Sequence, residues 1–157
     1  MAKTGSPDGI KVIASNRRAR HDYFIEDTWE AGLVLLGTEV KSLRQGKATI
    51  TEAYVRIEGN EAWLVGATIQ PWSHGNRNNH EPDRKRKLLL HRREIERLRG
   101  KINQQGFTLV PMKLYFSQGK VKLQIGLGKG KKHYDKRQDT KQRDAKRDMQ
   151  RAKRRER

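Results

Sequence analysis

The sequence predicts a mainly β protein: a small closed antiparallel barrel of about six strands, with two or three flanking helices and a disordered basic C-terminal tail. Short apolar segments recur between residues 10 and 128 and are separated by turns that contain glycine or asparagine, which is typical of small all-β domains. Two further stretches have the three- and four-residue apolar spacing of helices. We expect a closed barrel because closure leaves no exposed edge strand.

In the first half, turn and cap residues separate the predicted elements. Thr38 suits a helix N-cap and Gly46 suits the position after a helix C-terminus, so residues 39–45 are predicted to form a short helix. Gly59-Asn60 is a favourable two-residue hairpin turn. The predicted strands of this half are 23–25, 31–36, 54–58 and 61–66.

The second half contains a helix and a hairpin. Ile95, Leu98 and Ile102 have helical spacing, so residues 92–105 are predicted to be an amphipathic helix. From 110 to 116, and again from 121 to 125, apolar and mostly polar residues alternate, which indicates two strands with one wet, basic face. Residues 88–90 are three consecutive leucines. Successive side chains of a strand point to opposite faces, so we expect Leu89 to face outward. The glycine-rich run 126–132 is expected to be a flexible exit from the barrel.

Charge divides the chain into three parts: a flexible N-terminus (1–9), a barrel domain (10–128) and a basic tail (129–157). The tail has 14 basic and 5 acidic residues. It has too few apolar side chains to offset the entropy lost on ordering, so we expect it to be disordered when free. On a helix, however, its few apolar residues would share one side and several basic residues the other. This pattern indicates folding against a partner.

The composition excludes several classes of protein. No cysteine is present, so disulfides, thiolate metal sites and cysteine catalysis are excluded, and a reducing cytoplasmic location is expected. No apolar segment is long enough to span a membrane, and the N-terminus lacks the apolar region of a secretory signal. The formal net charge of +18 predicts a polyanionic partner. A nucleic acid is favoured over a membrane, and the barrel is then expected to be of the oligonucleotide-binding type, by analogy.

Catalysis, a metal and a cofactor are not expected. The five histidines lack metal-ligand spacing, and no acid, base and nucleophile set is evident. The run 126–132 resembles a phosphate-binding loop, but Lys131 and Lys132 stand where the two known motifs need glycine and a hydroxyl residue.

Three basic clusters are candidates for nucleic-acid contact, with Tyr23, Trp72 and Tyr115 as nearby aromatics that could stack on bases. The first cluster is Arg17, Arg18 and Arg20. The second is Arg84, Lys85, Arg86, Lys87, Arg92 and Arg93. The third is the tail.

Several blocks of sequence, in order, resemble the small protein B family, the bacterial SsrA-binding proteins that partner transfer-messenger RNA. The blocks are 16–23, 30–32, 37–44, 86–91, 126–132 and 135–137. The resemblance implies a barrel that binds the transfer-RNA-like domain of that RNA. It also implies delivery of the charged RNA, with elongation factor Tu and GTP, to stalled ribosomes for trans-translation, peptide tagging and ribosome rescue. The body would take the place of an anticodon arm, beside the small-subunit decoding centre, and the tail would fold as a helix in the empty message channel.

The resemblance and the basic clusters together give the candidate site. The resemblance implies RNA contacts by Asn16, Arg18, Glu30, Leu89 and Lys122. Glu30 cannot contact phosphate, but it can accept hydrogen bonds from base amino groups or sugar hydroxyls. The clusters and aromatics add Tyr23, Arg84, Arg86 and Lys87. The expected ribosome contacts of the tail are Gly130, Lys131, Lys132, Tyr134, Asp135, Lys136, Arg137, Arg143 and Arg147.

Two alternatives stay open on the residues alone. One is a resident ribosomal protein, which would be equally basic with equally loose ends. The other is a general single-strand RNA-binding barrel, which would bind sequence-tolerantly through stacking. For the function that the resemblance implies, we expect a monomer without a membrane association.

Overall fold

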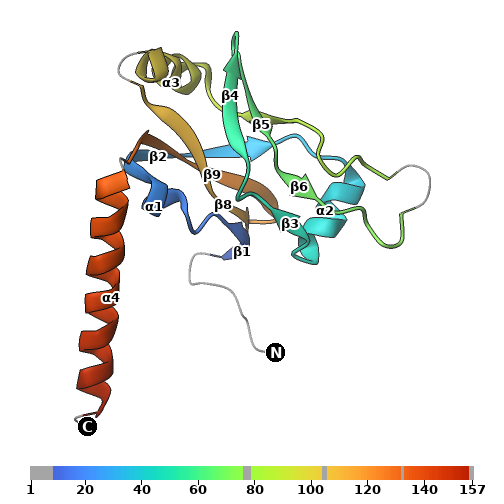
Figure 1. The fold of residues 1–157 in the computed structure, drawn as a ribbon. Coiled ribbons are helices and arrows are strands. Elements are labelled where there is room, and N and C mark those ends of the chain that lie inside the picture. The colour runs from blue at the N-terminus through green and yellow to red at the C-terminus, as the bar shows by residue number, and fades with distance from the viewer. Residues whose placement is uncertain (1–8, 76–78, 104–105, 132, 156–157) are drawn as a thin grey trace.

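The computed structural model describes residues 9–75, 79–103, 106–131 and 133–155, and within them it has nine strands and four helices (Figure 1). The predicted flexible N-terminus lies outside these residues except for Gly9, and Lys132 lies outside them too. The elements in chain order are β1 (Ile10–Ser15), α1 (Ala19–Asp22), β2 (Tyr23–Leu33), α2 (Gly37–Arg44), β3 (Ala48–Thr49), β4 (Tyr54–Glu58), β5 (Glu61–Val65), β6 (Thr68–Ile69), β7 (Arg86–Leu89), α3 (Arg92–Asn103), β8 (Thr108–Ser117), β9 (Lys120–Gly130) and α4 (His133–Arg155).

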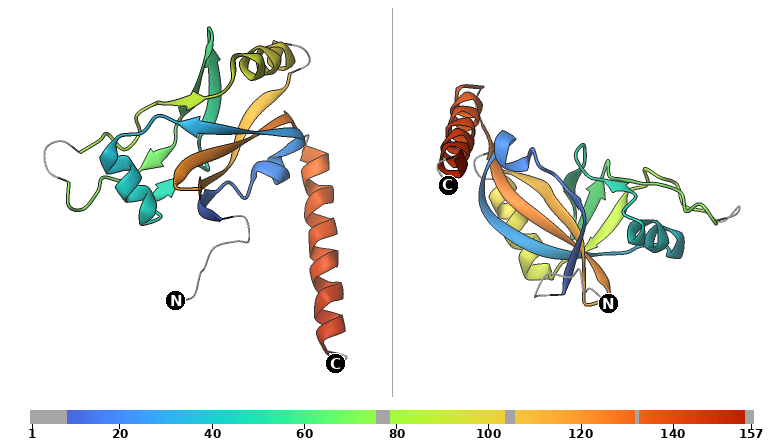
Figure 2. Two further views of the ribbon diagram at one scale, coloured as in Figure 1. Left: turned by 180° about the vertical axis from the view of Figure 1, so that it is seen from behind. Right: turned by 90° about the horizontal axis from the view of Figure 1, so that it is seen from below.

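The protein is mainly β, as expected, but its sheet is not closed into a barrel. Seven antiparallel strands follow the order β1-β8-β9-β2-β7-β5-β4, and β3 and β6 form a separate pair. The sheet curls so that β4 lies against β8, yet no ladder joins the two strands. The expectation of a closed barrel of about six strands is therefore corrected to an open, curled sheet of seven (Figure 2).

Beside the gap in the sheet, β8 bonds to β1 and to Asn16. β1 pairs with the second half of β8, and the backbone and side-chain amides of Asn16 then donate to the carbonyls of Met112 and Pro111. After Asn16 the chain turns into α1. A cavity lined by α1, by residues 51–54 and by Thr108–Val110 lies where a closing ladder would run.

Strands β2 and β9 are longer than the sequence indicated. β2 is one eleven-residue strand with a bulge between Ile25 and Asp27, where two runs were expected. β9 continues to Gly130, so the glycine-rich run is a strand up to that residue and not a flexible exit. A Cβ atom at Gly126 would lie 3.2 Å from Ile25 and 2.8 Å from the Met112 sulfur. The side chains of Ile25 and Met112, from the strands on either side of β9, fill the space over Gly126, so a larger residue there would have to displace them.

Helix α2 begins before the expected N-cap. It starts at Gly37, and the Glu39 carboxylate accepts a hydrogen bond from the Leu36 N–H. The Thr38 hydroxyl lies 2.9 Å from the ring of buried His80, so this side chain joins α2 to a loop and does not cap the helix. Gly46 has a φ of 70°, as its predicted position after the helix requires.

The core lies on the concave side of the sheet, under α2 and α3. The alternation predicted for the second hairpin is confirmed for β9, where Leu123 and Ile125 are buried in this core with Leu114 of β8. On β8 it is wrong in part: Val110 and Met112 pack in a separate cluster, and Tyr115 on the expected wet face is buried, because a register shift between Pro111 and Lys113 interrupts the alternation. Of the three consecutive leucines, Leu88 is 2% exposed and Leu89 is 53% exposed, which confirms that Leu89 faces outward.

The tail is a 23-residue helix, α4, that projects from the body and packs against α1 at its first turns (Figures 1 and 2). The helical form that its periodicity indicated is thus present in the structure. The predicted change from disorder in the free chain to a helix on a partner stays a prediction.

Candidate nucleic-acid interface

The outward face of the sheet brings three of the expected RNA-contacting residues together. The register places Tyr115 opposite Lys122, Lys122 opposite Gly32, and Gly32 opposite Leu89, in one row across four strands. Glu30 belongs to the next row on the same face, opposite Gln124. The surface that we call the sheet face is thus defined by basic Lys122, acidic Glu30 and apolar Leu89, whose side chains are all at least partly accessible.

Tyr115 fixes Glu30 on the sheet face. Its hydroxyl donates a short hydrogen bond to the Glu30 carboxylate, and Lys113 lies over its ring, 5.6 Å from the centroid. Burial, together with the bond to Glu30, raises the pKa of Tyr115 far above its ordinary value, so its hydroxyl stays a donor. Because Tyr115 is only 5% exposed, the expectation that its ring could stack on a base is corrected.

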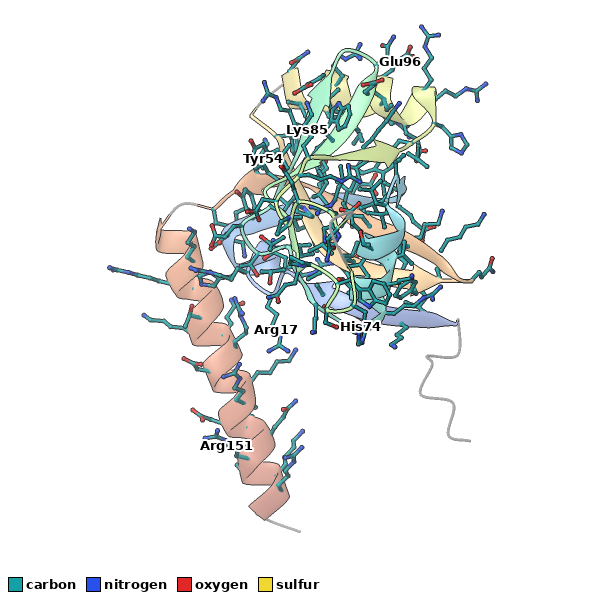
Figure 3. All side chains as sticks on the ribbon, turned by 90° about the vertical axis from the view of Figure 1, so that its right-hand side faces the viewer. Arg17, Tyr54, His74, Lys85, Glu96 and Arg151 are labelled. Carbon is teal, nitrogen blue, oxygen red and sulfur yellow. The ribbon has the colours of Figure 1, made fainter. Side chains whose placement is uncertain are left out.

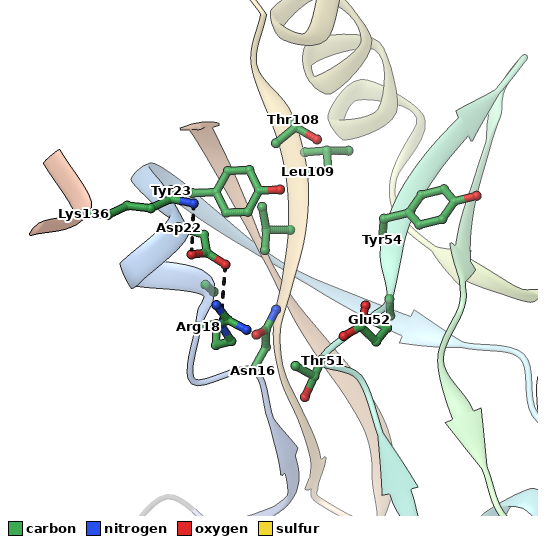
Figure 4. Close-up of a pocket in the computed structure, with 13 residues that line it drawn as sticks. Asn16, Arg18, Asp22, Tyr23, Thr51, Glu52, Tyr54, Thr108, Leu109 and Lys136 are labelled. Atoms are coloured by element: carbon green, nitrogen blue, oxygen red, sulfur yellow. Dashed lines mark ion pairs between the residues drawn. The ribbon is translucent and has the colours of Figure 1, made fainter. Parts of the chain in front are cut away.

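Asn16, Arg18 and Tyr23 lie elsewhere, in a polar cavity of about 270 Å³ beside α1 (Figure 4). Its other walls come from residues 51–54 and from Thr108–Val110, which lie in the gap of the sheet. The amide nitrogen of Asn16 is bonded to Pro111, and its side-chain oxygen is buried and has no hydrogen-bond partner among the described residues. The exposed side chain of Arg18 is a cationic group that this cavity offers to a ligand.

Asp22 joins this cavity to the tail. Its carboxylate lies 3.0 Å from His21 Nδ1, 3.5 Å from Lys136 Nζ and 3.9 Å from Arg18 Nε. The other ring nitrogen of His21 lies 3.3 Å from the Thr140 hydroxyl of α4. The hydrogen bond from His21 and the charges of Lys136 and Arg18 hold the pKa of Asp22 below its ordinary value.

Arg86 is a structural residue, which corrects its assignment to RNA binding. Its side chain is 0% exposed, and its Nε lies 2.6 Å from a carboxylate oxygen of Glu39, which is also fully buried. The remaining guanidinium groups donate to the carbonyls of Ala67 and Pro82. No part of the Arg86 side chain reaches the surface that an RNA could contact.

Arg84 and Lys87 flank this buried pair. Arg84 binds the other oxygen of Glu39 and the Val34 carbonyl, so most of its guanidinium is committed within the protein. Lys87 lies 3.2 Å from Glu61 at the surface. Burial alone would raise the pKa of Glu39, but hydrogen bonds from Arg84, from the Leu36 N–H and from Arg86 outweigh it and hold that pKa below its ordinary value.

The expected tail contacts divide into two groups. Gly130 ends β9, while the Lys131 N–H donates to the Asp22 carbonyl and its ammonium group to the Arg20 carbonyl. Lys136 pairs with Asp22, as above. Arg137, Arg143 and Arg147 are exposed on α4. Lys132 and the side chains of Tyr134 and Asp135 lie outside what the structure describes.

Sequence reasoning missed Asp22, His21 and Thr140 as a group that holds the tail. Nothing in their spacing shows that residues more than a hundred positions apart will meet. One sign was available, because Asp22 is an acidic residue directly after a cluster of three arginines. An acidic residue in such a place is a candidate partner for one of its basic neighbours.

Within the described ranges, no group of three or more histidine, aspartate or glutamate side chains is placed to hold a metal ion. In the same ranges, no helix has both the length and the apolar character needed to cross a membrane.

An open antiparallel sheet with a partly basic outer face, a polar cavity and a basic helical arm defines a class: small β proteins suited to bind a polyanion. The family model for the SmpB protein matches residues 13–155. The chain belongs to this family.

Individual relatives agree with the family match. The SsrA-binding protein of Desulfitobacterium hafniense is 54% identical, over 92% of this chain and 92% of the relative. That of Desulforamulus reducens is 55% identical over 96% and 94%, and that of Nocardia farcinica is 57% identical over 91% and 89%. A solved structure described as "tmRNA-SmpB: a journey to the center of the bacterial ribosome" matches with a TM-score of 0.63 and 52% identity, over 76% of this chain and 84% of that one.

Proposed function

We propose that this protein binds the transfer-RNA-like domain of transfer-messenger RNA and acts with it on stalled ribosomes in trans-translation. Family membership over nearly the whole chain carries the proposal, because relatives of this family are SsrA-binding proteins and a solved neighbour is a tmRNA–SmpB structure. The sheet face supports it, because Glu30, Leu89 and Lys122 come from three different strands onto one surface.

Each side chain of the sheet face has a distinct role in this proposal. Lys122 neutralises a backbone phosphate, and each phosphate neutralised releases counterions. Glu30, held by Tyr115, accepts a hydrogen bond from a base amino group or a ribose hydroxyl. Leu89 packs against the apolar surface of a base or sugar, for which its 53% exposure leaves room.

The polar cavity is proposed as a second contact with the same RNA. Arg18 supplies charge there, and Asn16 lines the cavity beside it. Tyr23 lines the same cavity and is partly exposed. Arg84 and Lys87 contribute only through their remaining exposed atoms.

The finer steps are also proposals. The protein acts as a monomer in the cytoplasm, without catalysing a reaction itself, and the charged RNA is delivered with elongation factor Tu and GTP. The body takes the place of an anticodon arm, and α4 enters the empty message channel, where Arg137, Arg143 and Arg147 contact ribosomal RNA. The exposed basic surface of α4 supports this last step.

Sequencing the RNA that co-purifies with the protein tests the proposal directly. We expect one RNA with a transfer-RNA-like end to be enriched far above its cellular share, and we expect ribosomes to carry the protein at well below one copy each. About one copy per ribosome would indicate a resident ribosomal protein. Loss of bound RNA to competing poly(U) would indicate a general single-strand binder.

A further inference from the structure

A basic hollow lies between α1 and α4, on a different side of α1 from the polar cavity. It has a volume of about 490 Å³ and is lined by Arg17, Arg20, Gln142, Arg143 and Lys146. Four of these five residues are cationic and none is acidic. Arg17 lies on the side of the body that faces α4 (Figure 3). We call this hollow the α1–α4 groove.

The four cations of the groove have no ionic partner in the part of the chain that the structure describes. Among the residues that the structure describes, no ion pair or hydrogen bond involves the side chain of Arg17, Arg20, Arg143 or Lys146, whereas Lys136 and Arg18 nearby both reach Asp22. The carboxylate of Asp22 therefore joins the α1 segment to α4 at one place. At the groove, the same two segments face each other with cations that have no ionic partner among the described residues.

This charge distribution opposes the packing of α4 on α1 in the absence of an anion. Four positive charges that line one concave surface repel each other, and a concave surface concentrates their field. The carboxylate of Asp22, and those of Asp144 and Asp148 along α4, offset only part of this repulsion, because exposed ion pairs stabilise a structure only weakly. A polyanion in the groove would remove the repulsion and favour the packed arrangement.

We propose that the α1–α4 groove binds the phosphate backbone of the partner RNA and that this binding holds the tail helix against the body, with Asp22 as the residue that positions it. The proposal rests on the proposed function, since the RNA is the same one. A nucleic acid is favoured over a small anion because the cations come from two facing segments and belong to a chain of net charge +18. The tail is then part of the RNA-binding surface before it meets a ribosome.

Binding to a transcript of the transfer-RNA-like domain, measured over a range of salt, tests the groove. Arg20→Ala and Arg143→Ala should each weaken binding several-fold and lower the salt slope by about one. The double variant should lose less than the product of the two single losses, because either change opens the groove. Lys101→Ala on α3 removes the same charge from an exposed site far from α4 and should have a smaller effect.

The Asp22→Asn variant distinguishes the positioning of α4 by Asp22 from the attraction of RNA by overall charge. The substitution makes the protein one unit more positive, so bulk attraction alone predicts tighter RNA binding. If Asp22 positions α4, binding becomes weaker. Tighter binding by this variant would overturn the proposed role of Asp22.

The position of the tail can be followed directly because the chain has no cysteine. Fluorophores on Asn103→Cys in α3 and Met149→Cys in α4 report the distance between body and tail. Adding the transcript should narrow the distance distribution in the wild-type background and do so less in Asp22→Asn.

The two levels of the proposal can fail separately. If the wild-type chain does not bind the transcript, the proposed function fails. If it binds, but Arg20, Arg143 and Lys101 variants lose affinity equally, or the Arg20 and Arg143 losses simply multiply, only the groove is overturned.

Discussion

Arg86 illustrates how burial decides what a basic residue does. The sequence places it within a run of four cations, but in the structure its guanidinium group donates hydrogen bonds to partners inside the protein, among them Glu39 and the Ala67 carbonyl. We expect Arg86→Met to destabilise the protein by about 3–5 kcal/mol, because it leaves the Glu39 carboxylate buried without that partner. Chemical denaturation measures the change. Lys101→Met, on an exposed site, is the control and should have little effect on the free energy of unfolding.

The Glu39 carboxylate also predicts a pH dependence of stability. Its pKa is lower in the folded protein than its ordinary value of 4.5, so the folded state favours the ionised form. The stability from this difference is fully present above pH 4.5 and is lost as the pH falls toward the folded pKa. Melting temperatures of the wild type and Glu39→Gln should therefore converge below pH 4.5. A constant gap across that range would contradict the assignment.

Leu89 is expected to matter for binding and not for folding. Because its side chain is 53% exposed, Leu89→Asp should change the melting temperature little. It should weaken RNA binding, since a negative charge would then stand on the sheet face. Leu88→Asp is the matched comparison: Leu88 is 2% exposed, so the same change there should unfold the protein. Equal destabilisation by both would place Leu89 in the core.

At the scale of an element, α4 should separate RNA binding from ribosome function. A chain that ends at Gly130 keeps every strand and α1 to α3, so we expect it to fold and to bind the RNA with reduced affinity. It should not support tagging on stalled ribosomes, which a tagging assay with a message lacking a stop codon measures.

Replacing Asp135, Lys136 and Arg137 together by alanine refines this test. Alanine favours helix, so a loss of tagging could not come from poor helix formation. The net charge falls by only one unit. Normal tagging by this variant, together with failure of the truncated chain, would show that the tail acts through bulk charge alone.

The elements show which parts of the fold local sequence can predict. The β4–β5 hairpin, α3 and the outward face of Leu89 were predictable, because each depends on alternation, spacing or a turn within a few residues. The open sheet was not, because closure would depend on pairing between β4 and β8, two strands far apart in the sequence. The same holds for the site: the resemblance found Glu30, Leu89 and Lys122, but no local pattern shows that Arg86 would be paired with Glu39 or that Asp22 would meet Lys136.

For the whole molecule, charge predicts a strong dependence of RNA binding on salt. Affinity for the transfer-RNA-like domain should fall by close to one logarithmic unit per phosphate contact for each tenfold rise in salt. Lys122→Ala should lower this slope by about one while the melting temperature stays the same. A flat salt response of the wild type would contradict a phosphate-based interface. A change in stability alone would show that Lys122 is not a contact.

The projection of α4 from the body has a mechanical consequence. Its 23 residues make a rod about 35 Å long, because a helix rises ~1.5 Å per residue. The rod is attached near one end, where Asp22 and His21 meet Lys136 and Thr140. It therefore works as a lever whose fulcrum is α1: a rotation of a few degrees there sweeps the far tip sideways by several times the displacement at the fulcrum. Small changes in the contacts of one carboxylate are thus amplified into a large change in where the end of the chain points.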